Sequence, residues 1–363
     1  MGSNSALKQE AVTALENGGL FAFGVSEKNH GSDLLANQFA IQEVAPGRFL
    51  ANGTKYYIGN ANAASMISIL ARKEDKRTAG RPNRAPLVLF TLRPRVSKGF
   101  QNIRKIRTLG VRAAFVGDFE VKDHELPDTD LIAEGRKAWD AVFGTVAMGK
   151  FFLGFGQIGI CERALEEAVT HLGGRILYGA PAIQMTHLRS ALVEAYARLT
   201  AMKLYAYRAL DYVQTSSAND RRYMLFTSVQ KARVSTEGVK VMSLLSECIG
   251  AKGFESETYF EMALRDAQLI PELEGSAHIK LGLTAQFIAA YFCHVASSVV
   301  APQSILAGQI AATENPYLMD ATTRGVNTIC FPKFLEAYRP LISIPNVRLF
   351  AKQDFVHLLR TKF

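Results

Sequence analysis

The hydrophobic pattern of the chain changes near residue 135, and this change limits the folds that it can adopt. Before this point, apolar residues come in short runs between turn-forming residues, which is typical of β-strands. After it, apolar residues recur at helical spacing over long stretches with few prolines. The pattern predicts an α+β protein, with a small β-barrel or sandwich domain followed by a four-helix bundle.

Within the β-rich part, several apolar runs have the length of a strand. They are residues 19–26, 66–72, 85–92 and 115–121. The dipeptide Asn52-Gly53 suits a type I′ turn, so residues 48–51 and 54–58 predict a hairpin. The expected domains are a partial N-terminal helix and a β-domain, then the bundle and a partly helical C-terminal extension. Their ranges are 1–19, 20–134, 135–301 and 302–363.

The four bundle helices are predicted at about residues 137–172, 181–214, 221–249 and 277–300. The most apolar stretch, residues 284–301, contains Gln286 and His294 and is barely long enough to cross a bilayer. A buried bundle helix explains it better, so we expect no membrane span. The polar N-terminus carries no signal-peptide pattern, and we expect a cytoplasmic protein.

The 363 residues carry a net charge of +9, which favours anionic partners such as phosphorylated cofactors. The densest basic stretches, between residues 72 and 107, are interrupted by acidic residues and glycines, so they indicate solvated loops and no nucleic-acid surface. The four cysteines are far apart and read as reduced core residues. No histidines pair at the spacing of metal ligands, so no metal site is expected.

The stretch Gly154-Phe155-Gly156-Gln157-Ile158-Gly159 matches the G-x-G-x-x-G pattern of dinucleotide-binding folds. Such a loop needs a strand before it, and a second strand ending in an acidic residue about 20 positions later. Here the surroundings are helical on both sides. We therefore interpret the glycines as helix-packing positions, with Gly149, Gly156 and Gly159 allowing another helix to approach closely.

Three other segments carry groups suited to chemistry. Residues 25–33 (VSEKNHGSD) end a strand with a glycine and a serine that could contact a phosphate. Residues 52–61 (NGTKYYIGNA) contain adjacent tyrosines. Residues 247–254 (ECIGAKGF) precede 264–280 (LRDAQLIPELEGSAHIK), where a carboxylate between two helices could act as a base. Each segment alone is equally consistent with an ordinary turn, hairpin or cap.

Together and in this order, the segments resemble the acyl-CoA dehydrogenase family. VSEKNHGSD is similar to T-E-P-x-x-G-S-D, and NGTKYYIGN is similar to N-G-x-K-x-W-I-T-N. RILYG at 175–179 resembles an R-K-Q-F-G loop, and 247–253 resembles Q-x-x-G-G-x-G. The R-D-A and Y-E-G-T motifs are matched by 265–267 and 273–276. The resemblance covers about residues 15 to 300.

The resemblance implies bound FAD and α,β-dehydrogenation of an acyl thioester in fatty acid metabolism, with Glu274 as the base. Glu272 is a competing carboxylate, but the E-G-S match favours Glu274. The implied cofactor-binding residues are Phe23, Val25, Ser26, Gly31, Ser32, Tyr57, Ile58, Gly59, Arg175, Tyr178, Glu247, Gly250, Ala251, Ser276 and His278. The implied substrate-binding residues are Ser32, Lys150 and Gly275.

The implied partners are an acyl-CoA or acyl-carrier-protein substrate and an electron-transferring flavoprotein. A homo-oligomer, or a hetero-oligomer with a related subunit, is also implied. The chain departs from the family pattern at Gly59, Glu247 and Lys150, and only about 20 residues precede the first motif. Two alternatives stay open, namely an oxygen-using oxidase or monooxygenase on the same fold and a non-catalytic subunit.

Overall fold

The structure is a computed structural model that describes residues 4–74, 85–214, 225–276, 279–280 and 282–284. The chain divides into two compact units, Met1–Val146 and Ala147–Phe363. Strands dominate the first unit and helices the second, as the change of pattern near residue 135 predicts. The fold is a β-sheet domain followed by a helical domain.

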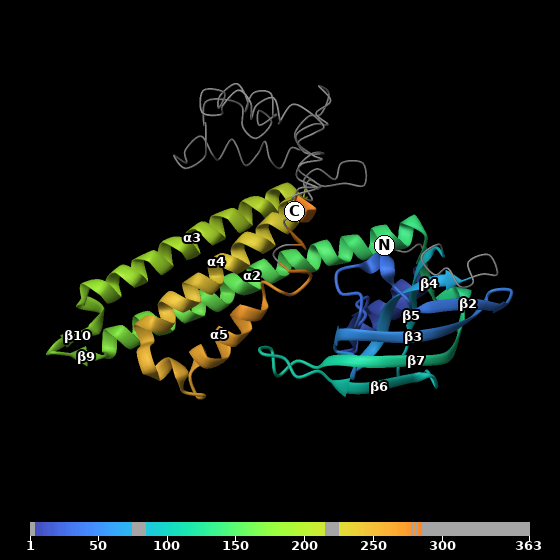
Figure 1. The fold of residues 1–363 in the computed structure, drawn as a ribbon, viewed down its shortest axis with the longest axis horizontal. Helices are drawn as coiled ribbons and strands as arrows, with labels where there is room; N and C mark the ends of the chain where they lie inside the picture. Colours follow the sequence, from blue (N-terminus) through green and yellow to red (C-terminus); the bar gives the residue numbers. More distant parts are fainter. Residues whose placement is uncertain (1–3, 75–84, 215–224, 277–278, 281, 285–363) are drawn as a thin grey trace, which may run out of the picture. The chain divides into compact units, whose positions relative to one another are not determined.

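The first unit contains one eight-stranded sheet (Figure 1). Its strands are β1 (Leu20–Gly24), β2 (Ala40–Ala45), β3 (Arg48–Gly59), β4 (Ala64–Glu74), β5 (Leu87–Leu92), β6 (Phe100–Lys105), β7 (Val116–Pro127) and β8 (Leu131–Glu134). Their order is β6-β7-β3-β2-β4-β5-β8, and β1 pairs with β4. β4 runs parallel to β1 and β2, and the other pairings are antiparallel.

The sheet has an apolar core in which Ile41, Ile67, Phe90 and Phe119 are fully buried. Every residue of β5 is buried, because the strand is covered on both faces. This explains its continuous apolar sequence in place of an alternating one. The predicted strands at 19–26, 66–72, 85–92 and 115–121 are confirmed by β1, β4, β5 and β7.

The predicted hairpin at Asn52-Gly53 is wrong, because β3 passes through both residues as one strand. The Asn52 side chain accepts a hydrogen bond from the Asp123 main-chain N–H of β7 at 2.8 Å. A Cβ on Gly53 would lie 2.6 Å from the ring of Phe39, so glycine is needed here for close packing. The turn that joins β2 to β3 lies instead at Pro46-Gly47, where Gly47 has φ +69°.

A short helix, α1 (Ser5–Glu16), precedes the sheet, and the Asn4 side chain caps its N-terminus. Glu10 of this helix accepts hydrogen bonds from the Arg93 guanidinium at 2.5 and 2.7 Å. Arg93 also donates to Asp130 at 2.9 Å. The arginine therefore ties α1 to residues just beyond β5 and β7.

The second unit is helical, and α2 enters it from the first. The helices are α2 (Arg136–Gly174), α3 (Thr186–Gln214), α4 (Leu225–Ile249) and α5 (Tyr259–Leu269). Their shared core includes Ala164, Ala195, Ala206 and Ala263, small residues that let helices lie close together. α2 is long and apolar enough to cross a membrane by length and composition alone, a test that bundle-core helices also pass.

The first predicted helix is confirmed by α2. The second begins later than predicted, at Thr186, because residues 180–181 form strand β10 (Ala180–Pro181) and 182–184 a 3-10 turn. α4 confirms the described part of the third. Most of the fourth, at 277–300, lies outside the described residues. Cys161 and Cys248 are buried free thiols, as predicted for core cysteines.

The G-x-G-x-x-G stretch lies inside α2, so it forms no phosphate-binding loop. Gly154 is the close-packed position, since a Cβ there would lie 2.3 Å from Nε2 of Gln230 in α4. The expectation for Gly156 and Gly159 is wrong. Both are exposed, and within the described part of the chain no atom lies within 4 Å of a Cβ placed on either.

Candidate functional site

In the first unit, the segments 25–33 and 52–61 lie side by side. The main-chain N–H of Tyr56 donates to the Ser26 carbonyl at 2.9 Å. The Lys55 ammonium donates to the Val25 carbonyl at 3.1 Å and to the Glu27 carboxylate at 2.9 Å. The two motifs that the sequence singled out therefore form one structural element.

Glu27 and Lys55 form a buried ion pair, with side chains 7% and 0% exposed. Glu27 also accepts hydrogen bonds from the main-chain N–H groups of Gln38 and Phe39 at 2.8 and 3.0 Å. Burial lowers the pKa of Lys55 to about 8, although Glu27 opposes that shift. The pair's hydrogen bonds compensate for the cost of burying two charges and fix the motif backbone.

The outer edge of this element is accessible. Gly31, Ser32, Tyr57 and Gly59 are exposed. Ser32 and Tyr57 have φ values of +69° and +62°. Tyr57 is 62% exposed and packs edge-on against Tyr56 with ring centroids 4.5 Å apart.

The other predicted residues of this unit differ in what they can offer. Val25 and Ile58 are buried in apolar clusters, so only their main-chain atoms remain for a ligand. Phe23 and Ser26 are half-buried. The sequence did not distinguish side-chain from main-chain roles among these residues.

In the second unit, Arg175 begins a tight hairpin between α2 and α3. The hairpin pairs β9 (Ile176–Leu177) with β10 around Tyr178 and Gly179, whose φ values are +51° and +83°. Tyr178 is fully exposed. Positive φ at both loop positions is the type I′ geometry, which favours glycine at the second.

Arg175 lies beside the end of α4. Nη1 of Arg175 would be 3.9 Å from a Cβ on Gly250, which has φ +71°. Lys252 and Arg175 both lower the pKa of His171, after the larger effect of burial. Three basic groups thus gather here, while the exposed Glu247 lies in the last turn of α4 and the exposed Ala251 lies in the 3-10 helix that follows it. The arrangement is suited to an anion.

Glu274 lies after α5 in a left-handed turn, with φ +55° followed by +94° at Gly275. Oε1 of Glu274 would be 3.7 Å from a Cβ on Gly149 of α2. Burial raises the pKa of the carboxyl group, and Lys150, Lys231 and Lys280 oppose the shift. A left-handed non-glycine residue costs about 1–2 kcal/mol, so the surrounding contacts must maintain it.

The remaining predicted residues lie around this turn. Lys150 is 6% exposed on α2, and burial lowers its pKa while Glu274 raises it. Gly275 and Ser276 are half-buried. His278 lies outside the described residues. Among the described residues, no group of three histidine, cysteine or acidic side chains could hold a metal ion.

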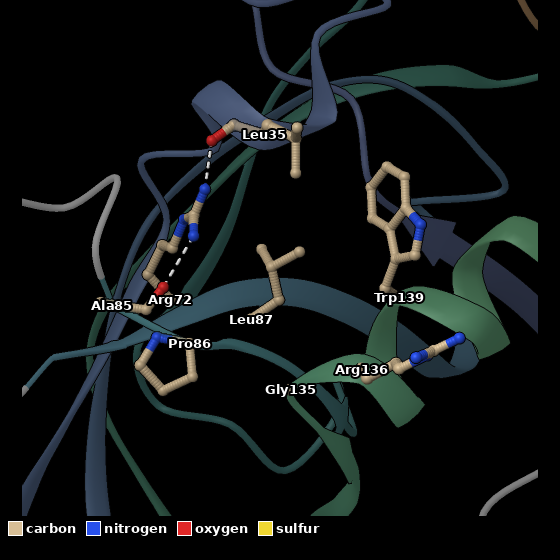
Figure 2. Close-up of a pocket in the computed structure, with 8 residues that line it drawn as sticks. All are labelled: Leu35, Arg72, Ala85, Pro86, Leu87, Gly135, Arg136 and Trp139. Carbon is tan, nitrogen blue, oxygen red and sulfur yellow. Dashed lines mark hydrogen bonds between the residues drawn. The ribbon is translucent and has the colours of Figure 1, made fainter.

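A separate hollow of about 530 Å³ opens in the first unit (Figure 2). It is lined by Leu35, Arg72, Ala85, Pro86, Leu87, Gly135, Arg136 and Trp139. The Arg72 guanidinium donates to the carbonyl oxygens of Leu35 and Ala85, so it serves to join two chain segments (Figure 2). None of the predicted site residues lines this hollow.

Comparison with known protein families matches both units. Residues 22–124 match the acyl-CoA dehydrogenase middle domain, and residues 137–289 match the acyl-CoA dehydrogenase C-terminal domain. The chain belongs to the acyl-CoA dehydrogenase family. The resemblance seen in the sequence motifs is thereby confirmed.

Individual members of the acyl-CoA dehydrogenase family are distant relatives. A cyclohex-1-ene-1-carbonyl-CoA dehydrogenase of Syntrophus aciditrophicus is 24% identical over 266 residues, which are 73% of this chain and 62% of that protein. The chain therefore spans less than two thirds of the length of this relative.

Solved structures of the family show the same fold. Butyryl-CoA dehydrogenase from Megasphaera elsdenii matches with a TM-score of 0.72 at 22% identity, covering 79% of this chain and 73% of that one. An acyl-CoA dehydrogenase complexed with FAD from Bacillus anthracis matches with a TM-score of 0.71 at 20% identity, covering 80% and 51%.

Sequence reasoning missed Lys231 and Lys280, two fully buried lysines near Glu274. Lys231 lies within an ordinary helical pattern, and Lys280 follows a family motif without being part of it. Their burial depends on tertiary packing. The only available signal was a lysine at a core position of the helical repeat.

Proposed function

We propose that this chain is an FAD-dependent acyl-CoA dehydrogenase in which Glu274 removes the α-proton of an acyl thioester. Family membership supports the reaction class. The observation that carries the assignment is the Glu274 carboxylate beside Gly149 of α2, which has a pKa raised by burial although the residue keeps an exposed surface. A raised pKa makes a carboxylate a stronger base while it remains ionised at neutral pH.

The residues of the first unit fit a flavin. The exposed backbone at Gly31, Ser32, Tyr57 and Gly59 offers polar main-chain groups with little side-chain obstruction, and Tyr57 adds an aromatic face. No described atom lies within 4 Å of a Cβ placed on Gly31 or Gly59. We propose that this edge, with Phe23, Val25, Ser26 and Ile58 behind it, binds the isoalloxazine part of FAD.

The residues of the second unit fit the anionic part of the same cofactor. Arg175 and the main chain at Gly250 and Ala251 would hold the pyrophosphate, with Tyr178 nearby. Glu247 is exposed and would repel a phosphate, which weakens binding without preventing it. Ser276 and His278 are proposed to lie near the flavin.

Bound FAD would supply the acceptor for the hydride that leaves the β-carbon. The chain's own task is to move the α-proton, which is only weakly acidic, to a Glu274 carboxylate oxygen. The thioester carbonyl must be polarised at the same time. The main-chain N–H of Glu274 is proposed to donate to it, which stabilises the developing enolate. Ser32, Lys150 and Gly275 are proposed to contact the acyl thioester.

The partners follow from the same proposal. The substrate is an acyl-CoA or an acyl-carrier-protein thioester, and an electron-transferring flavoprotein accepts the electrons. We propose that the protein works as a homo-oligomer or together with a related subunit.

The test uses two neighbouring carboxylates. Glu272 is exposed and lies two residues from Glu274, so Glu272→Gln is a matched control for Glu274→Gln. The purified chain should be yellow, and anaerobic butyryl-CoA should bleach its flavin. Glu274→Gln should keep the flavin and lose at least 100-fold in bleaching rate, the order expected for removal of a general base, about 10²–10⁴-fold. Glu272→Gln should bleach normally.

Two results would refute the proposal. One is rapid bleaching by Glu274→Gln with normal flavin content. The other is purification of the chain without flavin and with no recovery on adding FAD. Steady oxygen consumption with butyryl-CoA would indicate the oxidase alternative instead of the dehydrogenase.

A further inference from the structure

Three buried lysines surround Glu274. Lys150 lies on α2, Lys231 on α4, and Lys280 six residues after the glutamate. Lys231 and Lys280 are 0% exposed and Lys150 is 6% exposed. Burying an ammonium group is costly unless it has partners, so three of them in one place call for a specific role.

Two of the lysines bind the turn that presents the glutamate. The Lys231 ammonium donates to the carbonyl oxygens of Pro271 and Leu273 at 2.8 and 2.7 Å. The Lys280 ammonium donates to the Pro271 carbonyl at 2.7 Å. Three hydrogen bonds therefore hold the two residues that flank Glu272, and the second of these residues adjoins Glu274.

The turn has few other main-chain hydrogen bonds among the described residues. The N–H groups of Glu272 and Leu273 donate to the Leu269 carbonyl at 3.0 and 3.3 Å. Beyond Leu273 the chain enters the two left-handed residues, Glu274 and Gly275. Because the left-handed conformation of Glu274 is unfavourable by itself, the lysine contacts just before it help to maintain it.

The same lysines set the electrostatic environment of the carboxylate. All three lower the pKa of Glu274 against the effect of burial. Burial, followed by the neighbouring Lys280 ammonium, lowers the pKa of Lys231 to about 6, and Glu272 and Glu274 oppose that shift. Burial and Lys150 lower the pKa of Lys280, opposed by Lys231 and by the two glutamates.

We propose that Lys231 and Lys280 are positioning residues for Glu274 that hold its turn by the carbonyl oxygens, and that Lys150 supplies positive charge beside its carboxylate. The proposal rests on Glu274 being the base of the proposed function. Removing Lys231 or Lys280 loosens the turn, and removing Lys150 leaves the carboxylate with less positive charge around it. Glu274 then binds a proton at higher pH and is a poorer base in mildly acidic solution.

The first experiment measures the turn without any turnover. Hydrogen–deuterium exchange, followed by mass spectrometry on the flavin-loaded full chain, reports on amides 272–276. Lys231→Met and Lys280→Met should raise their exchange rate about tenfold, and Lys280→Arg should raise it less because it retains a donor. Lys240→Met is the control, since Lys240 lies on α4 with a side chain 54% exposed. Unchanged exchange in both methionine variants would refute the proposal that Lys231 and Lys280 hold the turn.

The second experiment measures the charge effect. Anaerobic flavin reduction by butyryl-CoA is followed from pH 6 to pH 9 in the wild type and in Lys150→Met. This variant keeps the hydrogen bonds from Lys231 and Lys280 to the turn. The variant should lose more rate at pH 6 than at pH 9, by up to about tenfold when the pKa of the base rises by one. An equal loss at both pH values would show that the lysine does not act through the charge of Glu274.

The outcomes separate this inference from the proposed function. If Glu274→Gln still bleaches, the base is misassigned, whatever the lysine variants do. If Glu274→Gln fails to bleach while the lysine variants match the wild type in both experiments, Glu274 is the base but the lysines do not position it.

Discussion

Replacing Gly238 by alanine tests the close packing of α4 against α2. A Cβ at this position would lie 2.2 Å from Cγ and 2.4 Å from Nε2 of Gln157. Gln157 is fully buried, and its Cγ is close to its own backbone, so the side chain has little room to move away. The alanine methyl group therefore requires the two helices to shift.

Two opposing terms set the magnitude. Alanine in place of glycine inside a helix is favourable by about 1 kcal/mol. Overpacking a dense core costs about 1–3 kcal/mol. Gly238→Ala should therefore lower the free energy of unfolding by about 0–2 kcal/mol, while Gly156→Ala, at an exposed site where no described atom lies within 4 Å of the added Cβ, should raise it by about 1 kcal/mol. The propensity term cancels in the difference between the variants, which should be about 1–3 kcal/mol.

Urea unfolding of the full chain, followed by circular dichroism at 222 nm, measures the helices. The fluorescence of Trp139, the only tryptophan, follows the first unit separately. A double-mutant cycle with Gln157→Ala adds a further test, because removing the Gln157 side chain should abolish the penalty of Gly238→Ala. Equal stability of Gly238→Ala and Gly156→Ala would refute the packing argument, and so would an additive cycle.

Two further predictions concern ion pairs of the first unit. Lys55→Met should cost about 3–5 kcal/mol in the free energy of unfolding, because it leaves the buried Glu27 carboxylate without its cation. Lys55→Met combined with Glu27→Gln should recover part of this loss in urea unfolding, and no recovery would contradict the ion-pair account. Arg93 lowers the pKa of Glu10 below 4.5, so the stabilisation is present above pH 4.5 and is lost as pH falls through the lower, folded-state value. Thermal unfolding between pH 7 and pH 3 should show a shallower acid loss in Arg93→Ala than in the wild type, and an equal loss would count against the contact.

The helices α2, α3 and α4 were predictable because their apolar residues recur over many turns, and local pattern and packing agree there. The shorter α5, of 11 residues, was not predicted. The strands β1, β4, β5 and β7 were predictable for a similar reason, as each is a concentrated apolar run. β2, β6 and β8 were missed because they are short or polar, and β6 has no fully buried residue.

The Asn52-Gly53 error has a definite physical cause. The dipeptide does favour a hairpin locally, but the Phe39 ring needs a residue without a side chain opposite it. The same glycine therefore satisfies a packing requirement that no local pattern reveals. Gly154 shows the same principle, since it was distinguished from Gly156 and Gly159 only by the side chain of Gln230.

The candidate site was predictable where residues lie in contiguous motifs. Segments 25–33 and 52–61 meet as two adjacent parts of one structural element. The lysines around Glu274 were not predictable, because their convergence comes from helices separated by about eighty residues of chain. The pKa of Glu274 was also open from sequence, since burial and a helix start act in opposite directions. In the structure burial raises the pKa, and the opposing effect comes from Lys150, Lys231 and Lys280.

The left-handed residue Tyr57 interrupts the alternation of inward-facing and outward-facing side chains along β3. Before it, inward-facing residues carry odd numbers, as at Phe49, Ala51 and Lys55; after it, the inward residue is Ile58. The inward-facing side chains thus change from odd to even residue numbers at Tyr57, where the pairing with β7 also shifts. A deletion of Tyr57 would leave every remaining side chain chemically unchanged. It would also leave Ile58 facing the core and Gly59 facing solvent, because Tyr56 and Ile58 already pair with consecutive residues of β7 and Tyr57 is the extra residue between them. One inserted residue therefore presents an aromatic ring to solvent without changing the register of the strand on either side of it.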